Sequence, residues 1–374
     1  LTRSFICRIE HGKVRPSRQT LEEFARRLGR PLEYFTAASA GDRLQAGFHR
    51  LYAEGREAVS TGQMDAALEL GRRALDAALT LGDPEAELRA RLLLIEIHGA
   101  RGECGPALTA GEPLEAHRAD SPAVAALLAR GCIQLGDCCM RSDQLLTARR
   151  LYRRSLSLTA GRSPDLHVEA QLRLACCCAQ LGDTGEAAEA YRTVGAMPGP
   201  AEWAGLADLG RGGLLCLDGD LDGALQTTLA SRHRLEALGH TAAVYARHNQ
   251  AVIEGRTGHW DRAIELLQGC LEEYERRGET VLQASALEEL AECLLAHRYL
   301  HEALEICGQA LSLLGSEAHS FLRGRLYRQA ATIHLAGGDS QRAYDLGLVS
   351  LELFRHLGAR LEIDTTRAFL ERLL

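Results

Sequence analysis

A turn-and-alanine pattern of the form G-x-x-x-x-A recurs along most of this chain. Six copies begin with glycine, and two degenerate copies begin with Asp143 and Arg298. The alanines that close the copies are spaced by 40, 41, 39, 37, 39, 40 and 40 residues: Ala67, Ala107, Ala148, Ala187, Ala224, Ala263, Ala303 and Ala343. A nearly fixed period of this length is typical of proteins built from stacked structural repeats.

A second small residue precedes each turn by seven positions in seven of the eight copies, with Ile95 as the exception. These residues are Gly55, Gly136, Ala175, Gly212, Ala251, Ala291 and Ala331. Small residues at both places allow two antiparallel helices to approach closely. The intervening segments are rich in Ala, Leu, Glu and Arg, which favour helix, and almost none alternates with the period of a strand. The chain is therefore predicted to be all-α, with eight antiparallel helix pairs.

The small first-helix residue, the turn glycine and the second-helix alanine resemble the signature of tetratricopeptide repeats. The resemblance covers about residues 44–358, and residues 359–374 are predicted to form a capping helix. It implies a right-handed α-solenoid of about eight pairs within a repeat domain at 44–374. The period is nearer 40 residues than the usual ~34, and no proline closes the repeats. Longer helices explain both departures, as in bacterial regulators with stretched sensor repeats.

Composition and charge narrow the class of protein. The 374 residues are 46% hydrophobic and 25% charged, which is typical of a folded globular chain. There is no run of 18 apolar residues and no signal-peptide pattern, so a cytoplasmic protein without a membrane span is expected. Residues 1–35 carry eight Lys or Arg against four Glu; their net charge of +4 in a chain of −7 leaves −11 for the remainder. Any nucleic-acid contact is therefore predicted at the N-terminus.

The first 35 residues are predicted to form two short helices joined by a tight turn. Phe5, Ile6 and Ile9 share one helical face, with Thr2 placed to cap the start of that helix and Gly12 its end. A second helix follows Pro16 and Ser17 and ends at Gly29, before a last turn that begins at Pro31. The residues of its apolar face are Leu21, Phe24, Ala25 and Leu28.

This order resembles the Cro/XRE family of helix-turn-helix DNA-binding domains. The matching residues are Thr2, Ile6, Ile9-Glu10, Gly12-Lys13, Pro16-Ser17, Thr20-Leu21, Phe24-Ala25 and Leu28. The resemblance implies that Thr2 to His11 is the recognition helix, with arginines suited to guanine edges and basic residues after the helix suited to phosphates. The DNA-binding residues that it implies are Thr2, Arg3, Ser4, Arg8, Lys13 and Arg15.

The same resemblance implies that the chain starts inside the DNA-binding domain, without the family's first helix and most of its second. Residues 1–35 are then the C-terminal part of that domain, and residues 36–43 are a linker. DNA binding is accordingly expected of the intact gene product. The alternative is that residues 1–35 form a charged helical cap of the solenoid.

Catalytic and metal-binding patterns are absent from the sequence. Twelve cysteines include Cys138-Cys139 and Cys176-Cys177-Cys178, but consecutive helical residues point about 100° apart and no CxxC pair recurs at zinc spacing. These cysteines are interpreted as small apolar residues at helix contacts. The sequence has no GxxxxGK[ST], HExxH or GxSxG motif. No enzyme activity, metal or cofactor is predicted.

The tetratricopeptide resemblance also implies a ligand groove. In such superhelices the second, fifth, sixth and ninth positions of each first helix point inward. Counting back from the marker alanines gives the predicted groove residues Arg89, Arg130, Gln134, Arg173, His248, Asn249, Glu292 and Gln329. Asn249, the only asparagine, could bond both the N–H and the C=O of an extended peptide, and the three arginines could take a carboxylate.

Together these features resemble the RRNPP group of regulators, whose repeat domain binds a short signalling peptide. The resemblance implies a transcriptional regulator that senses a peptide or protein, binds double-stranded DNA and forms a homodimer across two half-sites. The alternative function is a tetratricopeptide interaction scaffold that does not bind DNA. The groove residues have an alternative too, as a merely solvated polar surface.

Overall fold

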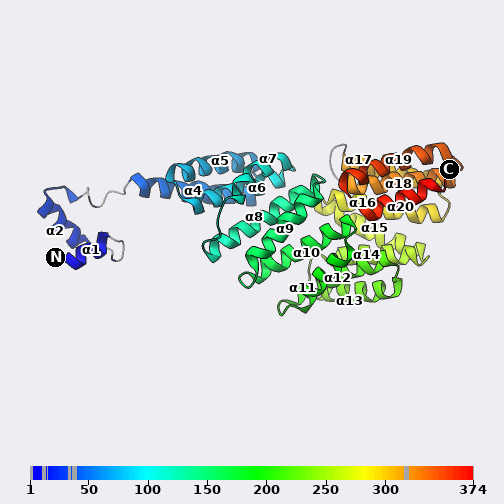
Figure 1. Ribbon diagram of the computed structural model, residues 1–374, viewed down its shortest axis with the longest axis horizontal. Coiled ribbons are helices and arrows are strands. Elements are labelled where there is room, and N and C mark those ends of the chain that lie inside the picture. Colours follow the sequence, from blue (N-terminus) through cyan, green and yellow to red (C-terminus); the bar gives the residue numbers. More distant parts are fainter. Residues whose placement is uncertain are drawn as a thin grey trace. The chain divides into compact units, whose positions relative to one another are not determined.

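The computed structural model describes residues 3–10, 14, 16–32, 35, 40–315 and 320–373 (Figure 1). Within these ranges the chain forms helices and turns and no β-strand, which confirms the all-α prediction. The chain divides into two compact units, Leu1–Leu93 and Leu94–Leu374, and each is described by itself.

The first unit contains two short helices and the first repeat. Its helices are α1 (Arg3–Glu10), α2 (Arg18–Leu28), α4 (Ala40–Ser60) and α5 (Met64–Leu81), and α6 (Pro84–Ala100) runs across the division. The Ser17 hydroxyl accepts a hydrogen bond from the Thr20 N–H at 3.2 Å, and Gly29 ends α2 with φ 62°. Both signals match the predicted bounds of the second helix. The predicted caps at Thr2 and Gly12 lie outside the described residues.

The second unit continues the helix pairs to the C-terminal cap. Its elements are α7 (Cys104–Gly111) with a 3₁₀ turn (Glu112–Glu115), α8 (Pro122–Arg141), α9 (Leu145–Thr159), α10 (Pro164–Leu181), α11 (Thr184–Ala196), α12 (Ala201–Asp218), α13 (Leu221–Ala237), α14 (Ala243–Arg256), α15 (Trp260–Arg277), α16 (Thr280–Ala296), α17 (Leu300–Leu314), α18 (Ser320–Ala336), α19 (Ser340–Leu357) and α20 (Arg360–Glu371). The predicted pairs and the capping helix are confirmed.

The turn residue of every repeat has a positive φ. Six are glycines, which adopt this conformation without steric cost. The two degenerate copies do the same with side chains present, Asp143 at φ 61° and Arg298 at φ 66°. All eight marker alanines have an exposed fraction of 0%. The repeat pattern thus encodes one turn geometry and one close helix contact.

Two of the small first-helix residues, Gly136 and Gly212, lie directly against the paired second helix. A Cβ at Gly212 would be 2.3 Å from Thr228 Oγ1 of α13, and one at Gly136 would be 2.4 Å from the Tyr152 ring of α9. Prolines also mark the repeats, because α6, α8 and α10 each begin at one (Pro84, Pro122 and Pro164). Each of these prolines opens a repeat, whereas the tetratricopeptide signature has a proline at the close of one.

One helix of the second unit, α8, is long and apolar enough to cross a membrane by length and composition alone. Its 18-residue window has a mean hydropathy of 1.4, although no run of 18 apolar residues exists. More than half of that window, 56%, is buried inside the protein. A core helix of a soluble solenoid passes the same test, so this is weak evidence for a span.

The second unit coils until its last repeat contacts earlier turns. Both carboxylate oxygens of Asp143, between α8 and α9, accept the Ser320 N–H at 3.0 Å. Gly182, between α10 and α11, lies beside α20, since a Cβ there would be 3.0 Å from the Leu361 nitrogen. The first contact joins the start of α18 to the α8–α9 turn, and the second places the capping helix α20 beside the α10–α11 turn.

Candidate ligand-binding groove

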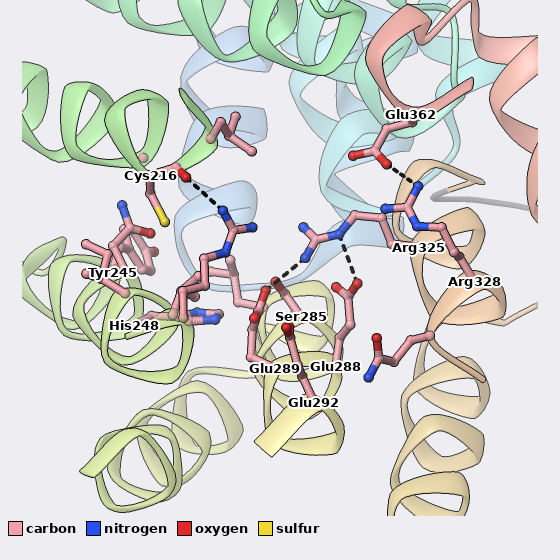
Figure 2. A pocket seen from close by; sticks show the side chains of 18 of the residues that line it. Cys216, Tyr245, His248, Ser285, Glu288, Glu289, Glu292, Arg325, Arg328 and Glu362 are labelled. Carbon is pink, nitrogen blue, oxygen red and sulfur yellow. Dashed lines mark hydrogen bonds and ion pairs between the residues drawn. The ribbon is translucent and has the colours of Figure 1, made fainter. Parts of the chain in front are cut away.

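A polar cavity of about 450 Å³ lies among the first helices of repeats five to eight and the capping helix α20 (Figure 2). Its wall includes Asn249 from α14, Glu292 from α16, Gln329 from α18 and Glu362 from α20. The helices position these side chains through the positive-φ turns and the alanine contacts, which hold neighbouring first helices in parallel register.

Charged side chains dominate this cavity. Arg325 lies between two consecutive glutamates of α16, with Nε 2.9 Å from Glu288 and Nη2 2.8 Å from Glu289. Arg328 pairs with Glu362 at 2.5 Å, which joins α18 to α20. Four carboxylates (Glu288, Glu289, Glu292 and Glu362) face three guanidiniums (Arg256, Arg325 and Arg328) around the same space. The wall therefore carries one more carboxyl group than guanidinium groups, and because the pKa of Glu288 is raised to about 8 this count is not a net negative charge at pH 7.

Burial changes the ionisation of several of these groups. It raises the pKa of Glu288, since the opposing charge of Arg325 is shared with Glu289 and does not offset the loss of water. The pKa of Glu292 is also raised, because the protein atoms around its carboxyl group reduce its contact with water even though the side chain opens on the cavity, and the neighbouring charge of Glu289 acts in the same direction. The pKa of His248 is lowered by burial, and its Nδ1 lies 3.1 Å from the Tyr274 hydroxyl.

Two polar atoms of this cavity's wall are buried without a hydrogen-bond partner among the described residues. They are Oε2 of Glu288 and Nε2 of Gln329. Glu288 is only 6% exposed. Glu292 is exposed toward the cavity and makes no ion pair within the described part of the chain. Unsatisfied buried polar atoms cost free energy, so Glu288 and Gln329 are held in this wall at some cost to the stability of the fold.

A second cavity of about 620 Å³ adjoins the polar one, because Tyr245 at the start of α14 lines both. Its wall is mainly apolar and comes from α10, α11, α12 and the start of α14. The apolar contributors are Val168, Leu172, Tyr191, Trp203, Leu206 and Leu209. We call the two cavities together the inner groove.

Four of the predicted groove residues come together in the polar cavity: His248, Asn249, Glu292 and Gln329. The Asn249 Nδ2 donates to the Leu209 carbonyl at 3.2 Å, which orients its amide. His248 is 7% exposed, so most of its ring is inside the helix contact.

The other predicted groove residues are dispersed. Arg173 lines the apolar cavity and lies 3.5 Å from the Asp137 carboxylate. Arg130 is exposed and Gln134 half-buried on α8, and neither lines the inner groove. Arg89 is in the first unit, paired with Glu85 at 2.7 Å.

Three of the six predicted DNA-binding residues lie on α1. Arg3 and Ser4 begin this helix, and Arg8 is exposed near its end. Thr2, Lys13 and Arg15 lie outside the described residues.

Most of the charged wall is not among the predicted groove residues. The same inward positions, counted back from Ala303 and Ala343, also contain charged or polar side chains in repeats seven and eight. These are Ser285, Glu288, Glu289, Arg325 and Arg328. Complete counting would have found them, whereas Glu362 is outside the repeats and reaches the cavity only because the solenoid coils back.

No protein-family model matches the chain, and no curated protein sequence matches it. Solved structures do share the fold. A Rap protein complexed with competence and sporulation factor is 11% identical, with a TM-score of 0.54 over 88% of this chain and 97% of that one. The APC/C hetero-tetramer Cut9-Hcn1 is 16% identical, with a TM-score of 0.53 over 90% of this chain and 56% of that one.

A tetratricopeptide repeat protein from Parabacteroides merdae is also similar, at 17% identity and a TM-score of 0.43, over 86% of this chain and 98% of that one. At such identities the likeness concerns the fold alone. The chain is an α-solenoid of tetratricopeptide-like helix pairs.

Proposed function

We propose that this chain is a regulator whose repeats bind a short, extended peptide in the inner groove. The observation that carries the proposal is the union of two adjoining cavities, one polar and one apolar, along successive first helices. A peptide in extended form offers backbone groups to the first and alternate side chains to the second. The fold shared with a Rap protein complexed with competence and sporulation factor supports this function.

Asn249 is proposed to bind the peptide backbone. A carboxamide donates and accepts, so it can pair with both the N–H and the C=O of one residue. The Leu209 carbonyl engages one amide N–H of Asn249 and holds the side chain at the edge of the polar cavity. Arg173 is proposed to contact the peptide's carboxyl end at the apolar cavity.

Replacing Asn249 provides the test. We expect Asn249→Ala to weaken peptide binding by about 1–3 kcal/mol, because backbone groups of the bound peptide lose their partner. The probe is a synthetic pool of random hexapeptides, and the peptides retained by the immobilised chain are identified and titrated. Gln226→Ala removes an exposed amide from α13 and is the matched control. Equal affinity in wild type and Asn249→Ala would show that the backbone contact is assigned wrongly.

We further propose that residues 1–35 belong to a helix-turn-helix DNA-binding domain, followed by a linker at 36–43 and the repeat domain at 44–374. The basic charge of the segment, the exposed Arg8 on α1 and the capped helix α2 support this assignment. Arg3, Ser4 and Arg8 are proposed to read bases, and a homodimer is proposed to span two half-sites. Peptide binding then changes the separation of the two DNA-reading heads.

The competing function is an interaction scaffold whose inner groove holds another protein. A gel-shift titration of the intact gene product on its own upstream DNA separates the two. Sequence-selective binding that weakens with salt supports the regulator, since phosphate contacts release counterions. Absence of binding at every salt concentration supports the scaffold.

A further inference from the structure

We propose that the apolar cavity recognises a bulky apolar side chain of the bound peptide and, next to it, a basic side chain. This inference rests on the proposed peptide binding and deepens it, because it states which peptides the inner groove selects. Three features of the cavity wall carry it: open apolar surface, an accessible tyrosine hydroxyl and a set of carboxylates without ion pairs.

The apolar surface of this cavity comes mainly from the first helices α10, α12 and α14. Leu172 of α10 and Leu206 and Leu209 of α12 are half-buried, so each keeps apolar surface open to the cavity. The Tyr245 ring adds an aromatic face, since its hydroxyl donates to Glu279 at 2.9 Å and leaves the ring to line the space. The volume of about 620 Å³ is within the range of ligand-binding sites and admits a bulky side chain.

The Tyr191 hydroxyl of α11 is a polar point of the same wall. Tyr191 is 8% exposed, and a Cβ at Gly210, which also lines the cavity, would be 2.1 Å from the ring carbon that bears the hydroxyl. The hydroxyl has no hydrogen-bond partner among the described residues, yet, unlike Oε2 of Glu288, it retains accessible surface. It can therefore donate to a backbone carbonyl of the peptide beside the apolar side chain.

Three carboxylates surround this apolar space, Asp165 and Glu169 from α10 and Glu202 from α12. The first two are exposed and the third is half-buried, and none forms an ion pair within the described part of the chain. Arg173 of the same wall already lies 3.5 Å from the Asp137 carboxylate. A basic side chain of the peptide would offset this negative charge, including that of the peptide carboxyl group proposed at Arg173.

The experiment uses four pools of hexapeptides with free termini. Each pool contains one fixed pair of adjacent residues, in either order and at any position, among residues drawn at random from glycine, serine, threonine, asparagine and glutamine. The pairs are phenylalanine with arginine, phenylalanine with glutamine, alanine with arginine and alanine with glutamine, so the apolar and basic contributions are separated. Each pool is passed over the immobilised chain at pH 7, and retained peptides are quantified by mass spectrometry.

Wild type is compared with variants of the cavity wall. Glu169→Gln combined with Glu202→Gln removes two carboxylates, and Leu206→Trp fills the apolar space. The matched control combines Glu272→Gln with Glu302→Gln, because both residues are exposed on second helices and line neither cavity. Circular dichroism of each variant establishes that it is folded.

We expect wild type and the control to retain the phenylalanine pools roughly tenfold more than the alanine pools, because a bulky apolar side chain leaves water. Arginine should add a further factor of about two to five, which about 1 M NaCl abolishes because the carboxylates contact water. Leu206→Trp should lose the phenylalanine preference, and the variant without Glu169 and Glu202 should lose the arginine preference. Tyr191→Phe should weaken retention of all four pools alike, since its hydroxyl contacts the backbone.

Equal retention of the phenylalanine and alanine pools by wild type overturns the inference, as does an arginine preference that persists without Glu169 and Glu202. Retention of none of the four pools overturns it too when the fully random hexapeptides are retained, and peptide binding then stands. If the fully random hexapeptides are not retained either, the proposed peptide binding itself is contradicted.

Discussion

Glu288 and Glu289 share the single guanidinium of Arg325, and their side chains are 8% and 10% exposed. Removing charges from water costs several kcal/mol per ion in a protein, so such a triad is weak evidence for stability. Apolar side chains at these three positions would pack a solenoid equally well. The retention of charge at a cavity wall, with Oε2 of Glu288 unpartnered, instead fits a role in ligand recognition.

His248 gives a pH-dependent prediction at the same scale. Burial lowers its pKa, so the folded chain keeps the ring neutral at pH values where the unfolded chain, with a pKa of about 6.5, protonates. The contribution of His248 to the free energy of unfolding is therefore fully present above about pH 6.5, and it is lost as the pH falls through the pKa of the folded state. Glu288 has a raised pKa, so its effect on stability has the opposite dependence on pH. Its contribution to the free energy of unfolding is lost as the pH rises.

We therefore expect the melting temperature of wild type to fall more steeply from pH 7.5 to pH 5 than that of His248→Gln. Both proteins contain Glu288, so the difference between their pH slopes reports the titration of His248 alone. His356→Gln, at an exposed position on α19, should keep the wild-type slope. Parallel slopes for wild type and His248→Gln would contradict the assignment of a buried neutral ring.

Among the elements, two repeat turns place a residue other than glycine in the left-handed backbone conformation, and the surroundings of these two residues differ. The carboxylate of Asp143 accepts from the Ser320 N–H and so caps α18 from a distant turn. Arg298 has the same backbone conformation at an exposed position, with no capping role of this kind.

This contrast predicts opposite effects of glycine. Arg298→Gly should stabilise the chain by about 1 kcal/mol, because it removes the steric cost of positive φ. Asp143→Gly removes the same steric cost, but it also removes the carboxylate that caps α18, which contributes about 1 kcal/mol to stability. The net effect of Asp143→Gly on the free energy of unfolding should therefore be near zero or destabilising. Urea unfolding measures both, and hydrogen exchange at the start of α18 should speed up only in Asp143→Gly. If Asp143→Gly stabilises as much as Arg298→Gly, the capping role is wrong.

The helix pairs could be predicted from the sequence because their causes are local. A glycine or its substitute sets the turn, and an alanine such as Ala263 sets the helix contact a few residues later. Asn249 and Gln329 could be placed on the inner groove by position within the repeat. Glu362 could not, since its arrival at the cavity depends on the coiling of the whole second unit, which no repeat of about 40 residues specifies alone.

At the scale of the second unit, the capping helix is also part of the candidate site. The contact of Gly182 with Leu361 and the pair between Arg328 and Glu362 hold α20 against the inner helices. In an open solenoid a terminal helix only covers apolar surface. Here α20 supplies one wall of the polar cavity, so a bound peptide would be enclosed by residues from the far end of the chain.

Binding of a peptide in the inner groove of the second unit can be measured by hydrogen exchange with mass spectrometry. The probe is a hexapeptide retained by the immobilised chain from the pool of random hexapeptides, added at saturation. We predict slower exchange in the first helices α14, α16 and α18 and in α20, with little change in the second helices α13, α15 and α17. Protection confined to the second helices, or no change in either set, would contradict peptide binding in the inner groove.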